Sequence, residues 1–309
     1  MSANLERKLF WERVGRIGWS IVRGVIILGI CYVIFYPLIV KISSSLMREV
    51  DMFDNMVQFV PRMLYLENYR IVWEYMDYPV TFRNSLVLTL MVSLMQLASC
   101  TLIGYGFARF KWKGQSLLFA CVVFTLVVPP QMIMIPLYLN FRYFTFFGLL
   151  PEPGINLLGS IWPFVFTSLT GTGLKNGLFI YIMRQFFRNM PKDLEEAAAI
   201  DGAGAVRTFL RVMLPNAVPA MLTIFLFAFV WQWNDYFFTS IYLSNAKVLP
   251  VVLESVSMNI MNDINYIADH YRSILDNTGM ILFIAPLLIL YAILQRYFIE
   301  GVERTGIVG

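Results

Sequence analysis

Charge is scarce in this sequence. Only 14% of its 309 residues are Asp, Glu, Lys or Arg, whereas 58% are hydrophobic. A soluble domain carries about a quarter charged residues, so a chain of this composition needs lipid around part of its surface. The net charge is only +4, and the basic residues lie at the edges of apolar segments instead of along one stripe. That distribution points to membrane lipid as a partner and not to nucleic acid.

Histidine and cysteine are also rare. His270 is the only histidine, and Cys31, Cys100 and Cys121 all lie in apolar runs. We interpret the cysteines as small buried hydrophobes, because neither a disulfide framework nor a metal-binding spacing is present. A membrane enzyme would need clustered His, Cys or carboxylate groups, so the sequence does not predict an enzyme or a metal site.

No nucleotide-binding loop of the form G-x-x-x-x-G-K-[ST] occurs in the sequence. The glycine-rich stretch GTGLKNG, Gly171–Gly177, has a different spacing. The chain therefore has no nucleotide cradle of its own. We expect no cofactor on this chain, and any energy from ATP must arrive through a partner.

Long apolar segments are abundant. Six of them are present, at about 21–40, 84–107, 116–140, within 155–187, 216–242 and 279–298. Each can cross the hydrocarbon core as a helix of about 20 residues, and the first is too long for the apolar part of a cleaved signal peptide. Pro129, Pro130 and Pro136 predict a kink in the third. The sequence predicts an all-α polytopic membrane protein with six transmembrane helices.

Lysine and arginine gather on one side of these spans. If the N-terminus lies inside, most of the 24 basic residues fall in inside segments. These are Arg7, Lys8, Arg13, Arg16, Arg23, Arg109, Lys111, Lys113, Arg184, Arg188, Lys192, Arg207, Arg211, Arg296 and Arg304. Basic loops stay in the cytoplasm, so we expect both termini there. Residues 1–20 then form a cytoplasmic segment, 21–40 the first span, 41–82 a folded periplasmic loop and 299–309 a cytoplasmic tail.

Residues 189–221 are too polar to span and too regular for a plain linker. Pro191 suits the first turn of a helix, and Asp193, Glu195 and Glu196 follow it, where negative charge is favourable. The alanines that follow are strong helix formers whose small side chains allow another protein to approach closely. Glycines at 202 and 204 allow a turn, and a second short helix over 205–213 follows.

Pro215 is expected to end the second helix by pushing Leu214 out of the helical region. From this pattern alone, the segment can be a surface hairpin or a docking element.

The stretch resembles the cytoplasmic coupling loop of binding-protein-dependent ABC importers. That family's pattern is E-A-A, three residues, G, nine residues, an aliphatic residue, any residue and L-P. It is matched at Glu196, Ala197, Ala198, Gly202, Val212, Leu214 and Pro215. The one departure is Val in place of the commoner Ile. The resemblance implies that Glu196 reaches a basic group of an ATPase subunit while the alanines permit contact. The implied coupling residues are Glu195, Glu196, Ala197, Ala198, Asp201, Gly202, Leu214 and Pro215.

The resemblance extends from about Phe82 to the C-terminus. The stretches Arg184–Gly204, Trp231–Phe238 (WQWNDYFF) and Gln295–Gly301 (QRYFIEG) are similar to the carbohydrate and oligosaccharide branch, the maltose-permease-like proteins. This implies a type I ABC importer permease fold over residues 83–298, with the coupling loop at 189–215, in the bacterial inner membrane.

The implied partners are a second homologous permease subunit, an ATPase subunit dimer that binds ATP and Mg²⁺, and an extracytoplasmic solute-binding protein. The implied solute is a sugar or oligosaccharide. A permease for a peptide or amino acid shares the coupling motif and stays open as an alternative. A secondary transporter is a weaker one, because Asp235 is the only acid within a span and no repeat is visible.

Two groups of residues are candidates for the substrate pathway. The first, deep in the fifth span, offers the aromatic, amide and carboxylate groups that a sugar site uses. It consists of Trp231, Trp233, Asn234, Asp235 and Tyr236. The alternative for these residues is an interfacial aromatic belt.

The second candidate is Lys175, which lies among glycines in the fourth span, where an ionisable group usually faces a cavity or a partner. The alternative is that the span shifts and Lys175 reaches water.

Overall fold

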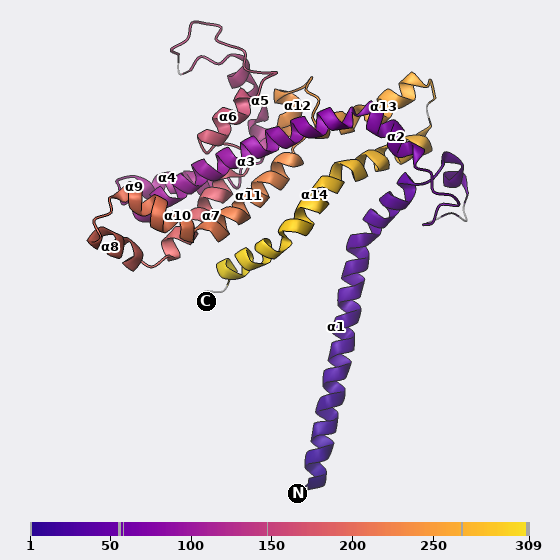
Figure 1. Ribbon diagram of the computed structural model, residues 1–309, viewed down its shortest axis with the longest axis horizontal. Coiled ribbons are helices and arrows are strands. Elements are labelled where there is room, and N and C mark those ends of the chain that lie inside the picture. Colours follow the sequence, from indigo (N-terminus) through magenta and orange to yellow (C-terminus); the bar gives the residue numbers. More distant parts are fainter. Residues whose placement is uncertain (1, 55–56, 58, 147, 267, 307–309) are drawn as a thin grey trace. The chain divides into compact units, whose positions relative to one another are not determined.

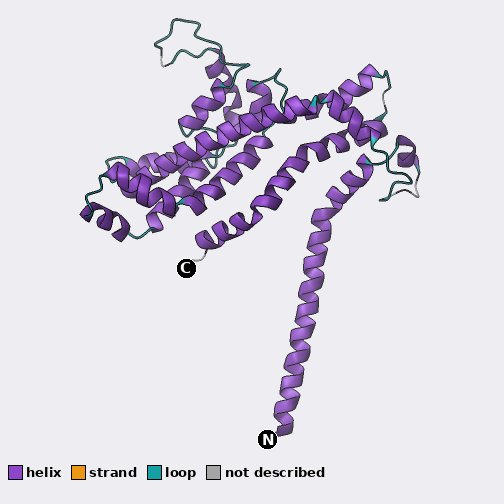
Figure 2. Cartoon of the chain, viewed as in Figure 1, coloured by secondary structure: helices purple, strands orange, loops and turns teal. Residues whose placement is uncertain are grey.

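The computed structural model describes residues 2–306 except 55–56, 58, 147 and 267, and it describes side chains within 12–295. The side chains of Arg7, Lys8, Arg296 and Arg304, used above for orientation, lie outside the described residues. Every regular element of the described chain is a helix (Figure 2), and one isolated antiparallel bridge joins Phe144 to Ile155. The predicted all-α class is therefore confirmed.

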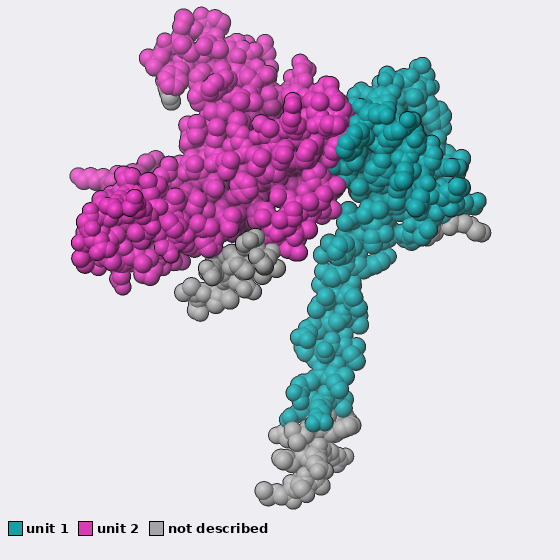
Figure 3. Space-filling model, in the orientation of Figure 1, with its two compact units in different colours: residues 1–75, 256–282 teal, residues 76–255, 283–309 magenta. Residues whose placement is uncertain are grey.

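The chain forms two compact units, coloured separately in Figure 3. Unit 1 comprises residues 1–75 and 256–282, and unit 2 comprises 76–255 and 283–309. In chain order, the helices are α1 (Ser2–Ser45), η1 (Glu49–Phe53), α2 (Glu67–Tyr75), α3 (Tyr78–Arg109), α4 (Gln115–Phe124), α5 (Pro130–Arg142), α6 (Trp162–Leu169), α7 (Asn176–Asn189), α8 (Asp193–Ile200), α9 (Ala205–Thr208), η2 (Phe209–Met213), α10 (Leu214–Asn216), α11 (Val218–Trp233), α12 (Phe237–Tyr242), α13 (Leu249–Asp263) and α14 (Asp269–Gly306) (Figure 1).

Three helical segments of the described chain are long and apolar enough to cross a bilayer, namely Glu12–Ser45, Tyr78–Arg109 and Asp269–Gln295. The bent pair Ala205–Asn216 and Val218–Trp233 adds a fourth if it counts as one span. The predicted third span is broken into α4 and α5, and the predicted fourth into α6 and α7. Several apolar spans are thus present, whereas the number six stays a prediction.

In unit 1, the end of α1 is fixed by buried polar contacts. The Asn68 side chain donates to the carbonyl oxygens of Ser45 and Met47 at 3.0 and 2.9 Å. The hydroxyl oxygens of Ser45 and Tyr69 lie 2.7 Å apart. Nearer the N-terminus of α1, apolar side chains such as Leu28 and Val33 are exposed. A helix with such a surface needs an apolar environment.

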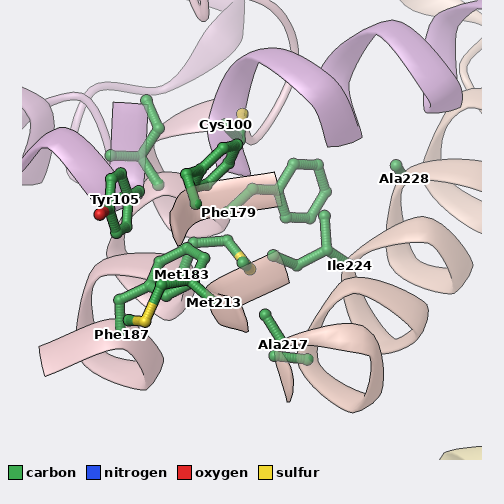
Figure 4. Packing of buried hydrophobic residues seen from close by; sticks show 12 residues of the cluster. Cys100, Tyr105, Phe179, Met183, Phe187, Met213, Ala217, Ile224 and Ala228 are labelled. Atoms are coloured by element: carbon green, nitrogen blue, oxygen red, sulfur yellow. The ribbon is translucent and has the colours of Figure 1, made fainter. Parts of the chain in front are cut away.

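The core of unit 2 lies where α3, α7 and α11 meet (Figure 4). Cys100 and Tyr105 of α3, Phe179 and Met183 of α7, and Ile224 of α11 belong to one buried cluster. The backbones of α3 and α7 approach closely, because a Cβ added to Gly104 would lie 2.5 Å from the Cβ of Met183. Small residues permit such contacts between membrane helices.

The helix after Gly204 does not end as predicted. Leu214 keeps helical dihedrals, φ −66° and ψ −45°, and the helix continues through Pro215. A π-helical turn, Phe209–Met213, comes directly before. Its wider hydrogen-bond spacing accommodates a proline that lacks an N–H. The chain bends by 74° between Asn216 and Val218 instead.

Candidate coupling loop and solute cavity

Helix α8 is short and has two defined ends. Three acidic residues occupy its first turn, where negative charge is favourable. At the other end the N–H of Ala203 donates to Ala198 O at 2.9 Å, and that of Gly202 donates to Ala199 O at 3.0 Å. Gly202 has φ 77°, as this type of helix end requires. The predicted glycine turn is therefore confirmed, and Figure 1 shows α8 at one end of unit 2, next to α9 and α10.

The predicted coupling residues do not all face outward. Glu196, Ala197, Asp201, Gly202 and Pro215 are exposed.

Ala198 is buried within this chain, and Leu214 is half-buried. The small side chain of Ala198 therefore serves packing inside unit 2, while Glu196 and Ala197 are available to another protein.

Glu195 turns inward to the end of α3. Its Oε1 accepts a hydrogen bond from the Tyr105 hydroxyl at 3.0 Å. Its Oε2 lies 3.3 Å from the Nε of Arg109, whose side chain is only 7% exposed. Arg109 also donates from Nη2 to the carbonyl oxygen of Met190 at 2.9 Å. These contacts attach α8 and the residues before it to α3.

Unit 2 also contains a large cavity of about 1260 Å³. It is bordered by two helix breaks, one between α4 and α5 and one between α6 and α7. Gly171 and Lys175 at the second break have φ 71° and 62°. An irregular backbone at membrane depth is tolerated only against protein or a water-filled space, and the cavity supplies such a space.

Lys175 and Trp231, both predicted as pathway residues, meet on this cavity. The Lys175 ammonium lies 5.6 Å from the centroid of the Trp231 ring. That ring is stacked on Phe179 and on Phe227, each with centroids 5.6 Å apart. The stacking fixes the indole, and the indole holds the ammonium by a cation–π contact.

Asp235 also lines the cavity, but its carboxylate is fully engaged. Oδ1 accepts from the N–H of Phe238 at 3.2 Å, and Oδ2 accepts from the N–H and the hydroxyl of Thr239, each at 3.0 Å. Asp235 therefore caps the start of α12, and these hydrogen bonds stabilise its carboxylate.

The other three predicted pathway residues lie elsewhere in unit 2. Trp233 is buried and donates from Nε1 to the carbonyl oxygen of Phe283 at 3.2 Å. The side-chain amide of Asn234 donates back to Val230 O at 2.7 Å. Tyr236 is exposed and does not line the cavity that the structure describes.

Sequence reasoning missed several polar residues on the cavity. Ser168, Asn176 and Gln232 are buried and each has a side-chain polar atom without a hydrogen-bond partner in the described structure. A signal was present, because amides such as Asn176 and Gln232 interrupt apolar segments.

The cysteines, predicted to be buried, differ in environment. Cys100 is buried and Cys31 is half-buried, whereas Cys121 is exposed because it lines the cavity. The prediction is thus wrong for Cys121.

Comparisons with known proteins identify the family of this chain. Residues 101–304 match the family described as the binding-protein-dependent transport system inner membrane component. The osmoprotective compounds uptake permease protein GgtD of Synechocystis sp. is 34% identical over 239 residues, covering 77% of this chain and 73% of GgtD. The melibiose/raffinose/stachyose import permease protein MelC of Bacillus subtilis is 26% identical over 278 residues, covering 89% and 92%.

A solved structure shares the fold. It is a chain of a bacterial ABC transporter involved in the import of the acidic polysaccharide alginate, with a TM-score of 0.71 and 22% identity. The match covers 91% of this chain and 96% of that chain. The chain therefore belongs to the inner-membrane permease components of binding-protein-dependent ABC importers, multi-pass membrane proteins that are not themselves enzymes.

Proposed function

We propose that this chain forms half of the translocation pathway of an ATP-driven importer for a sugar or oligosaccharide. Residues 189–215 couple it to a cytoplasmic ATPase. The observation that carries this proposal is that two adjacent acidic residues of α8 point in different directions. Glu196 faces outward, whereas Glu195 is bound to α3. A docking helix needs both a free face and a firm attachment to the helices it moves.

The proposed architecture follows the family. Six spans make a type I permease fold, with residues 1–20 and 299–309 in the cytoplasm and 41–82 in the periplasm. Residues 83–298 form the permease domain. The proposed partners are a second homologous permease, an ATPase dimer that binds ATP and Mg²⁺, and an extracytoplasmic solute-binding protein.

The mechanism uses α8 as a lever. Closure of the ATPase dimer shifts α8, and the contacts of Glu195 with Tyr105 and Arg109 transmit the shift to α3. The helical segment Ala205–Asn216, which meets α11 at the 74° bend, transmits the shift to α11. Both α3 and α11 contribute residues to the cavity, so moving them changes the access of the solute.

A saccharide as solute is supported by the cavity and by one relative. MelC is named as an importer of melibiose, raffinose and stachyose. The cavity combines an indole, buried amides and backbone turns, which is the mixture of apolar surface and hydrogen-bonding groups that hydroxyl-rich ligands need. We assign Lys175, Trp231 and Asp235 to the pathway, whereas Trp233 supports the fold around it.

The coupling role can be tested by charge reversal. Glu196→Lys and Gly202→Asp should leave the complete importer assembled in lipid vesicles but abolish ATP-driven uptake. Glu254→Lys reverses an exposed acid on α13 and should leave uptake unchanged. A Glu196→Lys importer that transports at the full rate would refute the assignment.

A non-sugar solute is the second candidate, favoured by the resemblance to GgtD, whose name refers to osmoprotective compounds. A peptide or amino acid belongs to the same alternative. Uptake assays with the purified importer separate these classes. Uptake that a protonophore abolishes and ATP does not drive would instead indicate a secondary transporter.

A further inference from the structure

The cavity in unit 2 carries two opposite charges, and only the negative one is held by hydrogen bonds of the chain. Within its described lining, Lys175 and Asp235 are the only charged residues. The Asp235 carboxylate already accepts three hydrogen bonds. Lys175 contacts the Trp231 ring but has no carboxylate or hydrogen-bond acceptor in the part of the chain that is described. A cation in such a place usually faces a ligand or a partner.

The backbone holds Lys175 at this break. Lys175 is the residue directly before α7 and has a left-handed φ of 62°. The side-chain amide of Gln96 in α3 donates to the carbonyl oxygen of Leu174 at 3.2 Å. A Cβ added to Gly173 would lie 3.0 Å from the same amide nitrogen. The segment is therefore packed against α3, and Lys175 is kept at the cavity.

Buried polar groups on the cavity add a second, independent observation. Asn176 is 1% exposed and neither side-chain amide atom has a partner in the described structure. Gln232 is 5% exposed with an unpaired Nε2, and Ser168 is 1% exposed with an unpaired hydroxyl. Unpaired buried polar groups cost free energy. These atoms are fully buried, so a solute reaches them only after the side chains turn toward the cavity.

We propose that Lys175 and Trp231, with Asn176 and Gln232 on the same cavity lining, form a subsite for an acidic group of the solute, so that this importer carries an acidic saccharide. The proposal rests on the proposed function, in which the cavity is the solute pathway. A solute carboxylate would pair directly with the ammonium, whereas a neutral sugar would offer it only uncharged hydrogen-bond acceptors. Lys175 is exposed on this cavity, so a solute carboxylate can reach its ammonium.

Cys121 provides a probe of this charge, because it is exposed on the same cavity. The complete importer, with Cys31 and Cys100 replaced by Ala, is treated in detergent with two thiol reagents. One is the anionic 2-sulfonatoethyl methanethiosulfonate and the other is the cationic 2-(trimethylammonium)ethyl reagent. Lys175→Gln should lower the anionic-to-cationic rate ratio at Cys121 by about threefold or more, and Lys175→Arg should preserve it.

The matched control is Lys247→Gln. It removes one positive charge of unit 2 outside the described cavity lining, where Lys247 pairs with Asp77 at 2.7 Å. This variant should leave the ratio unchanged. An unchanged ratio in Lys175→Gln, or an equal change in Lys247→Gln, overturns the subsite.

A second measurement tests the acidic saccharide. Trigalacturonate and its neutral methyl ester are compared for protection of Cys121 against methyl methanethiosulfonate. The acid should protect better than the ester, and Lys175→Gln should abolish the difference. An acid that protects no better than its ester overturns the proposal. Cysteine labelling needs neither ATP nor coupling to an ATPase. A negative labelling result therefore counts against the subsite alone, whereas a negative result in the Glu196→Lys uptake test counts against the proposed function.

Discussion

The Tyr105 hydroxyl donates a hydrogen bond to Glu195 Oε1 at 3.0 Å across 90 positions of sequence. The Tyr105 ring packs against Phe187 and Phe209, with centroids 5.2 and 4.7 Å away. One side chain of α3 thus contacts the helices before and after α8 as well as α8 itself. These contacts attach the candidate coupling loop to the rest of unit 2.

Removing parts of this attachment should have graded effects. Tyr105→Phe keeps the ring and loses one hydrogen bond, which costs about 1 kcal/mol. Arg109→Met leaves Glu195 without its cation and should cost about 2 kcal/mol or more. Thermal unfolding of the purified importer measures which variant loses more stability. In both variants, less solute should be imported per ATP hydrolysed. Equal melting temperatures and equal coupling in both variants and wild type would contradict the lever.

The close approach of α3 and α7 predicts a difference between two glycines two residues apart. Gly104→Ala places a Cβ 2.5 Å from the Met183 Cβ, so the helices must separate at a cost of about 1–3 kcal/mol. Gly106→Ala meets nothing within 4 Å and should be neutral or slightly stabilising. Thermal unfolding of both variants checks this, and an equal loss of stability would contradict the close approach of α3 and α7 at Gly104.

The end of α8 predicts a second glycine contrast. Gly202 has φ 77° with open space around it, so Gly202→Ala should cost about 1–2 kcal/mol through backbone strain alone. Gly204 has φ −72° and also has open space, so Gly204→Ala should be tolerated. Hydrogen exchange of the amides of α8 should accelerate only in the first variant. Faster exchange in both variants, or in neither, would argue against the turn.

Two tryptophans two residues apart should behave differently. Trp233→Phe loses the hydrogen bond to Phe283 O and should lower stability by about 1 kcal/mol without changing solute selectivity. Trp231→Phe removes the indole that contacts Lys175 and should change the apparent KM for the solute with little loss of stability. Uptake kinetics and melting temperatures together separate these roles. The reverse pattern would place the solute at Trp233.

Local sequence patterns predicted the features that depend on near neighbours. The acidic first turn of α8, the turn at Gly202 and the break near Pro129 and Pro130 all appear in the structure, whereas Pro191, predicted in the first helical turn, lies before α8. Each follows from backbone constraints of a few residues. The composition likewise predicted the helical membrane class.

Features that depend on distant residues could not be predicted in this way. Glu195 and Glu196 are adjacent and identical in type, yet only the fold brings Tyr105 and Arg109 to Glu195. Pro215 failed as a helix terminator because the π-helical turn before it accommodates the proline. Trp231 and Trp233 look equivalent in the sequence, but only Trp231 reaches the cavity.

Crosslinking from α8 examines whether an ATPase subunit binds the loop at residues 189–215. In the complete importer with Cys31, Cys100 and Cys121 replaced, a cysteine is introduced at the exposed Ala199 (Ala199→Cys) or, as a control, at the exposed Ser255 of α13 (Ser255→Cys). Position 199 should crosslink to a nucleotide-hydrolysing subunit, with a yield that differs between nucleotide-free and ATP-bound importer, and position 255 should not. A complete importer in which position 199 forms no such crosslink would contradict the proposed coupling.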